Sequence, residues 1–284
     1  MDAPLAAKAH LLTDFRVASG KATLEGVEAD GAAGPTVVFL HAGVADKRMW
    51  EAQLAALAGS HRAVAYDRRG FGGTRYSAEI FSQVDDLLAV LDDRAIARAA
   101  LVGCSQGARI AIDFALTHPD RVAALFLVAP AVTGAPSPED FPPPVEALLE
   151  LLEEAEEDED LERTNLLEAW MWLDGPGSEE GRVGGAVRDL FLTMNATALY
   201  AEDPGRETNP AAFPVAYSRL ADLQMPAQVV WGDSDFPHIQ QRCVHLVQAM
   251  PQATGNVIPG TAHLPNLEQP EVFNDRLRDF LEGL

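Results

Sequence analysis

The sequence predicts an α/β fold in which a mostly parallel central sheet has helices on both faces. Short apolar runs recur along the 284 residues, helical stretches separate them, and each run is continuously apolar rather than alternating. Continuous apolar runs are typical of strands buried on both faces, and their alternation with helices is typical of parallel sheets. The apolar share of 48% and the charged share of 23% suit a globular protein.

The expected elements follow one another in a regular order. Residues 15–30 alternate around glycines, which predicts an antiparallel hairpin at an edge of the sheet. The remaining strands are expected at residues 36–40, 62–66, 99–104, 123–129, 227–231 and 256–258, and the helices at residues 50–57, 81–91, 106–116, 239–250 and 271–281.

A long segment, residues 132–223, interrupts this alternation. It opens with a proline-rich stretch, continues rich in leucine and glutamate, and contains a Trp-Met-Trp cluster. Loops beyond the carboxyl ends of the strands build the active site of an open α/β sheet. We therefore expect residues 1–131 and 224–284 to form the core, and the interrupting segment to form a helical cap that acts as a lid.

The charge of the chain is strongly unbalanced, with 21 Lys and Arg against 43 Asp and Glu and a formal net charge of −22. A field of this sign repels phosphate backbones and anionic lipids, so we expect neither nucleic-acid nor membrane binding. Part of the excess lies in the run 153–160, which is expected to be a solvated helix face or a flexible loop.

Several features that a secreted or membrane protein would show are absent from the sequence. No apolar stretch approaches the roughly 20 residues that a transmembrane helix needs, and the N-terminus lacks a secretory signal. The two cysteines, Cys104 and Cys243, are too few for a disulfide framework. A cytoplasmic location is the expectation that follows.

A G-x-S-x-G motif occupies residues 103–107 and has Ser105 at its centre. The motif alone is weak, but here it follows one expected strand and opens an expected helix. This is the placement of a nucleophile elbow, in which glycines avoid clashes and the helix N-terminus favours an oxyanion. We expect Ser105 to be a catalytic nucleophile.

With this motif the sequence resembles the α/β-hydrolase superfamily over nearly all of its length. The resemblance implies an oxyanion hole made by the backbone N–H groups of Gly43 and Gln106, although Ala42 stands where the family usually has glycine. The matching segments are residues 39–43, like the family's strand ending in H-G-x; residues 66–72, like its D-x-R-G-x-G turn; and residues 231–235 and 260–263, like the turns that carry its acid and its histidine.

Among seven histidines, His263 is the expected general base. It alone follows the last strand on a Gly-x-x-His turn and comes after both candidate acids, which gives the order Ser, Asp, His typical of this fold. His41 ends a strand and is expected to be a structural hydrogen bonder. Of the others, His10 and His61 lie near the expected hairpin and before a strand. His118 lies at a helix end, and His238 and His245 lie in or near the helix after the acid turn.

Two aspartates follow the strand that ends at Trp231 and compete to be the acid. By resemblance, the G-x-x-D spacing from Gly232 selects Asp235, which precedes His263 by 28 residues. That separation leaves room for one helix and one strand. Asp233 is expected to pin the turn through its own backbone.

These residues predict a serine hydrolase that acts on a small-molecule substrate. His263 would remove the proton of Ser105 during attack, and Asp235 would orient the imidazole. No metal or cofactor is expected, because the histidines lack H-x-x-x-H spacing and no C-x-x-C occurs. By the same resemblance, a serine at the elbow argues against haloalkane dehalogenases and epoxide hydrolases, which use aspartate there.

A carboxylic-ester hydrolase is the broadest expectation for the reaction. A lactonase, a carbon–carbon bond hydrolase with the same triad, or a ligand-binding or signalling protein on the same scaffold stays open. Trp170 and Trp172 are expected to line the substrate pocket, or else to attach the cap to the sheet. Because binding pockets are mostly apolar, we expect small or medium uncharged acyl groups to be preferred.

Overall fold

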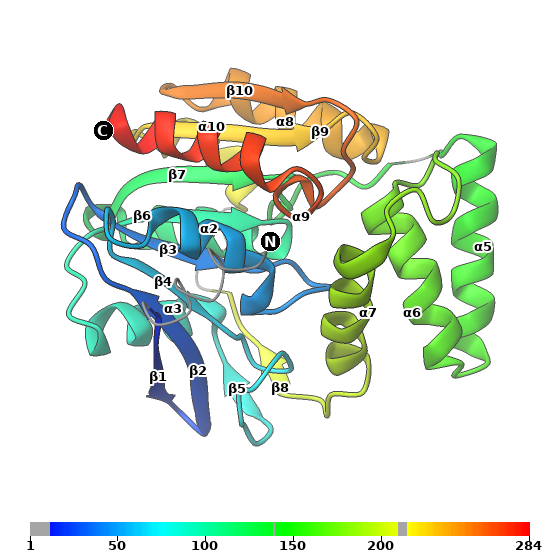
Figure 1. Ribbon diagram of the computed structural model, residues 1–284, viewed down its shortest axis with the longest axis horizontal. Helices are drawn as coiled ribbons and strands as arrows, with labels where there is room; N and C mark the ends of the chain where they lie inside the picture. Colours follow the sequence, from blue (N-terminus) through cyan, green and yellow to red (C-terminus); the bar gives the residue numbers. More distant parts are fainter. Residues whose placement is uncertain (1–11, 139, 210–214) are drawn as a thin grey trace, which may run out of the picture.

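The computed structural model describes residues 12–138, 140–209 and 215–284, and within them eight strands form one twisted sheet (Figure 1). The strand order across the sheet is β1-β2-β4-β3-β6-β7-β9-β10. The strands are β1 (Leu12–Ser19), β2 (Ala22–Ala29), β3 (Thr36–Leu40), β4 (Ala63–Tyr66), β6 (Ala99–Cys104), β7 (Val122–Val128), β9 (Ala227–Gly232) and β10 (Ala253–Ile258).

The sheet is mostly parallel, as predicted. Strands β4, β3, β6, β7, β9 and β10 pair in parallel, whereas β1 pairs with β2, and β2 with β4, in antiparallel orientation. The N-terminal hairpin therefore lies at one edge of the sheet, where the glycine-rich alternation placed it. The carboxyl ends of the parallel strands meet at a single edge, which collects their loops.

Helices cover both faces of the sheet, which confirms the predicted fold class. One face carries α3 (Gln83–Asp93), α4 (Gln106–Thr117) and α8 (Pro237–Ala249), and the other carries α2 (Glu51–Leu57) and α10 (Pro270–Glu282). Each face has its own apolar cluster.

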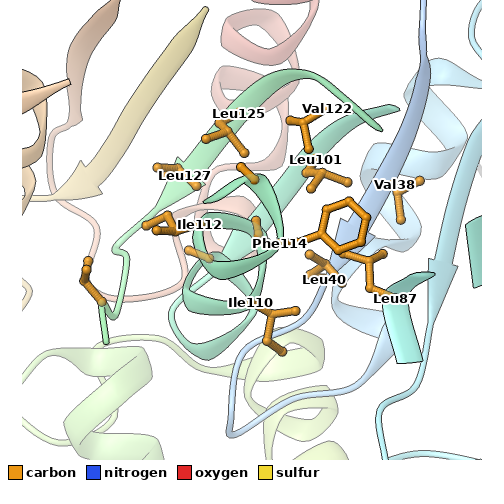
Figure 2. Packing of buried hydrophobic residues seen from close by; sticks show 14 of the residues in the cluster. Val38, Leu40, Leu87, Leu101, Ile110, Ile112, Phe114, Val122, Leu125 and Leu127 are labelled. Atoms are coloured by element: carbon orange, nitrogen blue, oxygen red, sulfur yellow. The ribbon is translucent and has the colours of Figure 1, made fainter. Parts of the chain in front are cut away.

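The central strand β6 shows why the apolar runs are continuous. Leu101 packs into the cluster on the α4 face, while its neighbours Ala100 and Val102 pack into the cluster on the other face. Figure 2 shows Leu101 beside Phe114 of α4 and Leu125 of β7. Burying each large side chain of this kind stabilises the fold by roughly 1.5–3 kcal/mol.

Three local features differ from the sequence prediction. The last strand begins at Ala253, before the expected residue 256, because its exposed polar start is held by parallel pairing with β9. Phe81 lies in a short strand, β5 (Glu79–Phe81), because the hydroxyl of Ser82 accepts a hydrogen bond from the N–H of Asp85 and caps α3, which begins at Gln83, two residues later than expected. Strand β5 pairs with β8 (Gly205–Glu207), which has no apolar pattern to predict it.

Between β7 and β9 the chain forms a largely helical excursion, whose long helices within residues 143–199 lie to one side of the sheet in Figure 1. The acidic run covers the end of α5 and the turn after it, and its carboxylate side chains are exposed. The prediction of a solvated helix face therefore holds for residues 153–157, which lie in α5. The elements of the excursion are α5 (Pro143–Glu157), α6 (Leu161–Ala169), the π-helical turn η4 (Trp170–Asp174), α7 (Gly185–Leu199), β8 and the 3-10 helix η5 (Ala216–Asp222).

Within the described residues, no helix is both long and apolar enough to cross a membrane.

Candidate active site

Ser105 lies in the sharp turn between β6 and α4. Its φ of 52° and ψ of −113° fall in a region that side-chain-bearing residues rarely adopt. The turn closes this tightly because Gly103 and Gly107 have no side chains. A Cβ on Gly103 would lie 2.6 Å from the N atom of Ala108, and a Cβ on Gly107 would collide with the carbonyl of Leu40.

Asp235 and His263 form a buried pair. The Asp235 Oδ2 atom lies 2.7 Å from Nδ1 of His263, and its Oδ1 accepts the N–H of Phe236 at 2.8 Å. The two residues are 3% and 2% exposed. Because the carboxylate accepts from Nδ1–H, the neutral ring presents an unprotonated Nε2 that can act as a base.

The topology brings this pair to the same sheet edge as the serine. Ser105 follows β6, Asp235 follows β9 and His263 follows β10, and these strands are parallel. The thiol of Cys104, the residue before Ser105, approaches the carbonyl oxygen of His263 at 3.7 Å. The histidine turn therefore lies against the end of the strand that carries Ser105.

Asp233 contacts a different turn from the one expected. Its Oδ1 accepts the backbone N–H of Gly260 at 2.7 Å, so it ties the acid turn to the histidine turn rather than closing its own turn. The parallel pairing of β9 and β10 places the two turns side by side, which makes this contact available. Asp233 is exposed, whereas Asp235 is buried against the imidazole.

Gly43 and Gln106 lie next to each other. A Cβ on Gly43 would come within 2.6 Å of the Gln106 side-chain nitrogen. Within the described ranges, neither backbone N–H donates to a protein acceptor. Ala42 has no positive φ, so alanine fits where the family usually has glycine, and its N–H points to the sulfur of Met49 at 3.4 Å.

His41 is occupied by structural hydrogen bonds. Its Nδ1 lies 2.8 Å from the carbonyl of Ala42, and its Nε2 accepts the N–H of Arg68 at 3.1 Å. Burial, helped by the charge of Arg68, holds the pKa of His41 well below its usual range. The ring is therefore neutral at physiological pH and has no free nitrogen to serve as a base.

The π-helical turn η4 carries Trp172 onto the histidine. The Trp172 ring centroid lies 4.7 Å from that of His263 and 5.2 Å from that of Phe236, and the Trp172 carbonyl accepts the N–H of His263 at 3.3 Å. Trp170 differs, because its indole N–H donates to the carbonyl of Ser178 at 2.8 Å within the excursion. Of the two expected pocket residues, the structure brings Trp172 to the histidine.

Sequence reasoning did not find the ionic contact between the excursion and the histidine turn. Arg182 pairs with Glu268 at 2.6 Å and donates to the carbonyl of Gly260 at 2.9 Å. Glu268 in turn accepts the N–H of Ala262, the residue before His263, at 2.7 Å. Burial raises the pKa of Glu268 to about 7 against the opposing effect of these partners. No motif signals this contact, because the paired residues lie 86 positions apart.

No group of three or more His, Cys, Asp or Glu side chains suitable for a metal ion occurs in the part of the chain that the structure describes.

The comparisons with known proteins agree with the fold. The profile of the Alpha/beta hydrolase family matches residues 37–276. A relative from Paraburkholderia phymatum, a 2-hydroxy-6-oxononadienedioate/2-hydroxy-6-oxononatrienedioate hydrolase, is 33% identical over 198 residues, which are 69% of this chain and 66% of that protein. The match thus spans just under two thirds of the relative's length.

Solved structures share the fold at lower identity. A carboxylesterase from Bacillus subtilis has a TM-score of 0.73 and 21% identity, with 99% of this chain and 96% of that chain covered. A thermophilic esterase from Thermogutta terrifontis has a TM-score of 0.72 and 23% identity, with 95% and 98% covered. Because the family profile matches most of the sequence and the fold agrees with it, this chain belongs to the alpha/beta hydrolase family.

Proposed function

We propose that this protein is a serine hydrolase that cleaves small or medium, largely uncharged carboxylic esters through an acyl-enzyme intermediate. The observation that carries the proposal is the buried 2.7 Å contact between Asp235 and His263 at the sheet edge where Ser105 sits on its strained turn. A serine hydroxyl becomes a useful nucleophile only when a positioned base takes its proton, and His263 is the base that we infer for this role.

The chemistry follows from the groups present. As the Ser105 oxygen attacks the ester carbonyl, Nε2 of His263 takes its proton and Asp235 stabilises the imidazolium. The N–H groups of Gly43 and Gln106 bind the negative oxygen of the tetrahedral intermediate. The imidazolium then protonates the departing alcohol, and water hydrolyses the acyl-enzyme by the same steps.

The surroundings of His263 support uncharged substrates. Trp172 and Phe236 form an aromatic wall beside the imidazole. The helical excursion adds negative charge through the exposed carboxylates of residues 153–160. An apolar wall favours apolar groups, and a negative field disfavours anions.

A carbon–carbon bond hydrolase is the second candidate, favoured by the name of the Paraburkholderia phymatum relative. That name describes substrates with two carboxylate groups, which would need cations in the pocket. Three arginines of the excursion are each ion-paired to a carboxylate, which makes them less available to a dianion. The pairs are Arg163–Glu154, Arg182–Glu268 and Arg188–Asp174.

A substrate panel tests the proposal. It should include p-nitrophenyl esters of two to eight carbons, simple lactones and a vinylogous diketone with and without carboxylates, each with the Ser105→Ala variant as control. We expect the highest kcat/KM with short or medium esters, and a loss of about 10³- to 10⁶-fold in kcat in the variant. Preferred turnover of the diketone would instead identify a carbon–carbon hydrolase.

Absence of turnover across the whole panel, together with tight binding of a small molecule by Ser105→Ala, would identify a binding protein.

A further inference from the structure

A buried arginine lies directly behind the two expected oxyanion donors. Arg68 is 2% exposed, and within the described ranges it forms no ion pair with a carboxylate. The next residue, Arg69, is equally buried but pairs with Asp86 at 2.8 Å and with Glu79 at 2.5 Å. Two adjacent arginines thus have opposite electrostatic surroundings, and only Arg69 has the partners of a structural ion pair.

The contacts of Arg68 are neutral and lead to the oxyanion side of the site. Its Nη2 donates to the carbonyl of Ala42 at 3.0 Å, and its Nη1 donates to Oε1 of Gln106 at 3.2 Å. The guanidinium also lies 4.4 Å from the ring centroid of Phe71, and its Nε has no hydrogen-bond partner among the residues that the structure describes. None of these groups carries a compensating negative charge.

A buried cation without a counter-ion is costly, and proteins rarely retain one without a reason. Burial lowers the pKa of Arg68 to about 10, which still leaves the guanidinium charged at neutral pH. Its charge therefore acts on its surroundings throughout the reaction. A negative charge that forms nearby during turnover would be stabilised by it in this desolvated setting.

The geometry of one peptide links Arg68 to the donor of Gly43. The carbonyl of Ala42 and the N–H of Gly43 belong to the same planar trans peptide, so they point in opposite directions. By holding the Ala42 carbonyl, Arg68 aims the Gly43 N–H away from itself. A charge-assisted hydrogen bond to the carbonyl also polarises the peptide and strengthens the N–H as a donor.

The second contact fixes the other donor residue. Gln106 Oε1 accepts from Arg68, and its Nε2 lies over Gly43 where a Cβ would otherwise be. The side chain of Gln106 is thereby held between the arginine and the glycine. Arg68 thus contacts both segments that carry the expected donors.

We propose that Arg68 is a positioning residue of the oxyanion hole, which orients and polarises the Ala42–Gly43 peptide, fixes Gln106 and favours the developing oxyanion through its charge. This inference rests on the proposed serine-hydrolase function. It concerns the transition state rather than substrate binding, because the oxyanion exists only after attack.

The test compares Arg68→Met with Arg68→Lys, which keeps the charge but not the forked geometry. The readouts are kcat and KM for p-nitrophenyl acetate, and the inhibition constant of a trifluoromethyl ketone, whose carbonyl adds the Ser105 oxygen to form a hemiketal oxyanion. Circular dichroism and melting temperature establish that each variant is folded at the assay temperature.

Arg68→Met is expected to lower kcat about 10²- to 10³-fold and to weaken the ketone by a similar factor, while KM changes less than about threefold. Arg68→Lys is expected to recover about tenfold of that loss, and it keeps the test open if the methionine variant does not fold. The matched control is Arg121→Met. Arg121 also donates to backbone carbonyls, those of Ile96 and Ala97, but it pairs with Asp92 at 2.8 Å and lies at the opposite ends of the strands.

The inference is overturned if folded Arg68 variants lose only melting temperature, or if KM rises while kcat and ketone affinity stay unchanged. Failure of the proposed function looks different, because the wild type itself would then show neither ester turnover nor ketone inhibition. That result would remove this inference together with the function on which it rests.

Discussion

The two sides of Ser105 are built from different parts of the molecule. The histidine side, Asp235 and His263, is in contact with the helical excursion through the ring and carbonyl of Trp172. The oxyanion side, Gly43 and Gln106, is held by core residues, above all Arg68. Any movement of the excursion should therefore disturb the proposed base while leaving the proposed oxyanion donors in place.

The two sides also differ in charge. The histidine side contains the carboxylates of Asp233 and Asp235 together with the Glu268–Arg182 ion pair, whereas the oxyanion side contains the guanidinium of Arg68, which has no ion-pair partner among the described residues. Ester hydrolysis by a serine creates a positive imidazolium and a negative oxyanion at the same time. The distribution of fixed charge across Ser105 matches the charges that this reaction would create.

The largest expected effect separates the two aspartates of the histidine side. Asp235→Asn should lower kcat for an activated ester by about 10⁴-fold, because an amide favours the wrong imidazole tautomer. Asp233→Asn should lower kcat less than about tenfold and act mainly on stability, since among the described residues the Asp233 side chain accepts a hydrogen bond from the Gly260 N–H alone. Steady-state kinetics of both variants check this, and a larger kinetic loss at Asp233 would reverse the assignment.

The next effect tests the contact between the excursion and the histidine side. Trp172→Ala should change the KM for longer acyl chains by several-fold to about a hundredfold and so shift the acyl-length profile. The KM for short acetates should change least. Trp170→Ala is the matched control, because its indole is bound to Ser178 within the excursion. It should lower the melting temperature and leave the profile unchanged.

If both tryptophan variants lower the melting temperature but keep the wild-type profile, the excursion is structural packing and not a lid.

A smaller effect is expected where the excursion is tied to the histidine turn by charge. Arg182→Met should lower the free energy of unfolding by about 2–4 kcal/mol, because it leaves the buried carboxylate of Glu268 without its partner. Arg163→Met removes a more exposed pair with Glu154 and should change stability by less than about 1 kcal/mol. Denaturant unfolding measures both, and equal losses would show that Arg182 is only a surface contact.

The smallest effect concerns acid stability on the oxyanion side. His41 has a lowered pKa in the folded state, first through burial and then through Arg68. Below about pH 6.5 His41 binds a proton in the unfolded chain but stays neutral in the folded protein. The stability that neutral His41 contributes is therefore present above that pH and lost as the pH falls. The loss should approach about 1.4 kcal/mol per pH unit. His41→Gln should lack this component of the slope, and identical slopes in the two proteins would contradict it.

The fold and the order of Ser105, Asp235 and His263 could be predicted because each depends on local patterns. Strand, glycine turn and helix lie within a few residues around Ser105, and the acid and the histidine each follow a buried strand. The carboxyl ends of parallel strands then meet at one edge whatever the details of packing. Turn chemistry and apolar periodicity were sufficient for the fold and for the turns that carry Ser105 and His263, whereas the choice of Asp235 over Asp233 rested on resemblance to the α/β-hydrolase superfamily.

The remaining features depend on contacts between distant or ordinary-looking residues. Arg182 and Glu268 are paired across 86 positions, and Arg68 differs from Arg69 only in which carboxylates the fold places nearby. Trp172 rather than Trp170 reaches His263 from a π-helical turn, whose geometry sequence periodicity does not specify. These differences arise from tertiary packing, which no local pattern records.

The central claim, that Ser105 is the activated nucleophile, is tested most directly by labelling with a fluorophosphonate and mapping the adduct by mass spectrometry. The serine oxygen displaces fluoride, so a single phosphonyl adduct on Ser105 is expected in the wild-type protein. The label should be absent from Ser105→Ala and much slower to form in Asp235→Asn. A folded wild-type protein that takes up no label, or a label that persists in Ser105→Ala, would contradict the account.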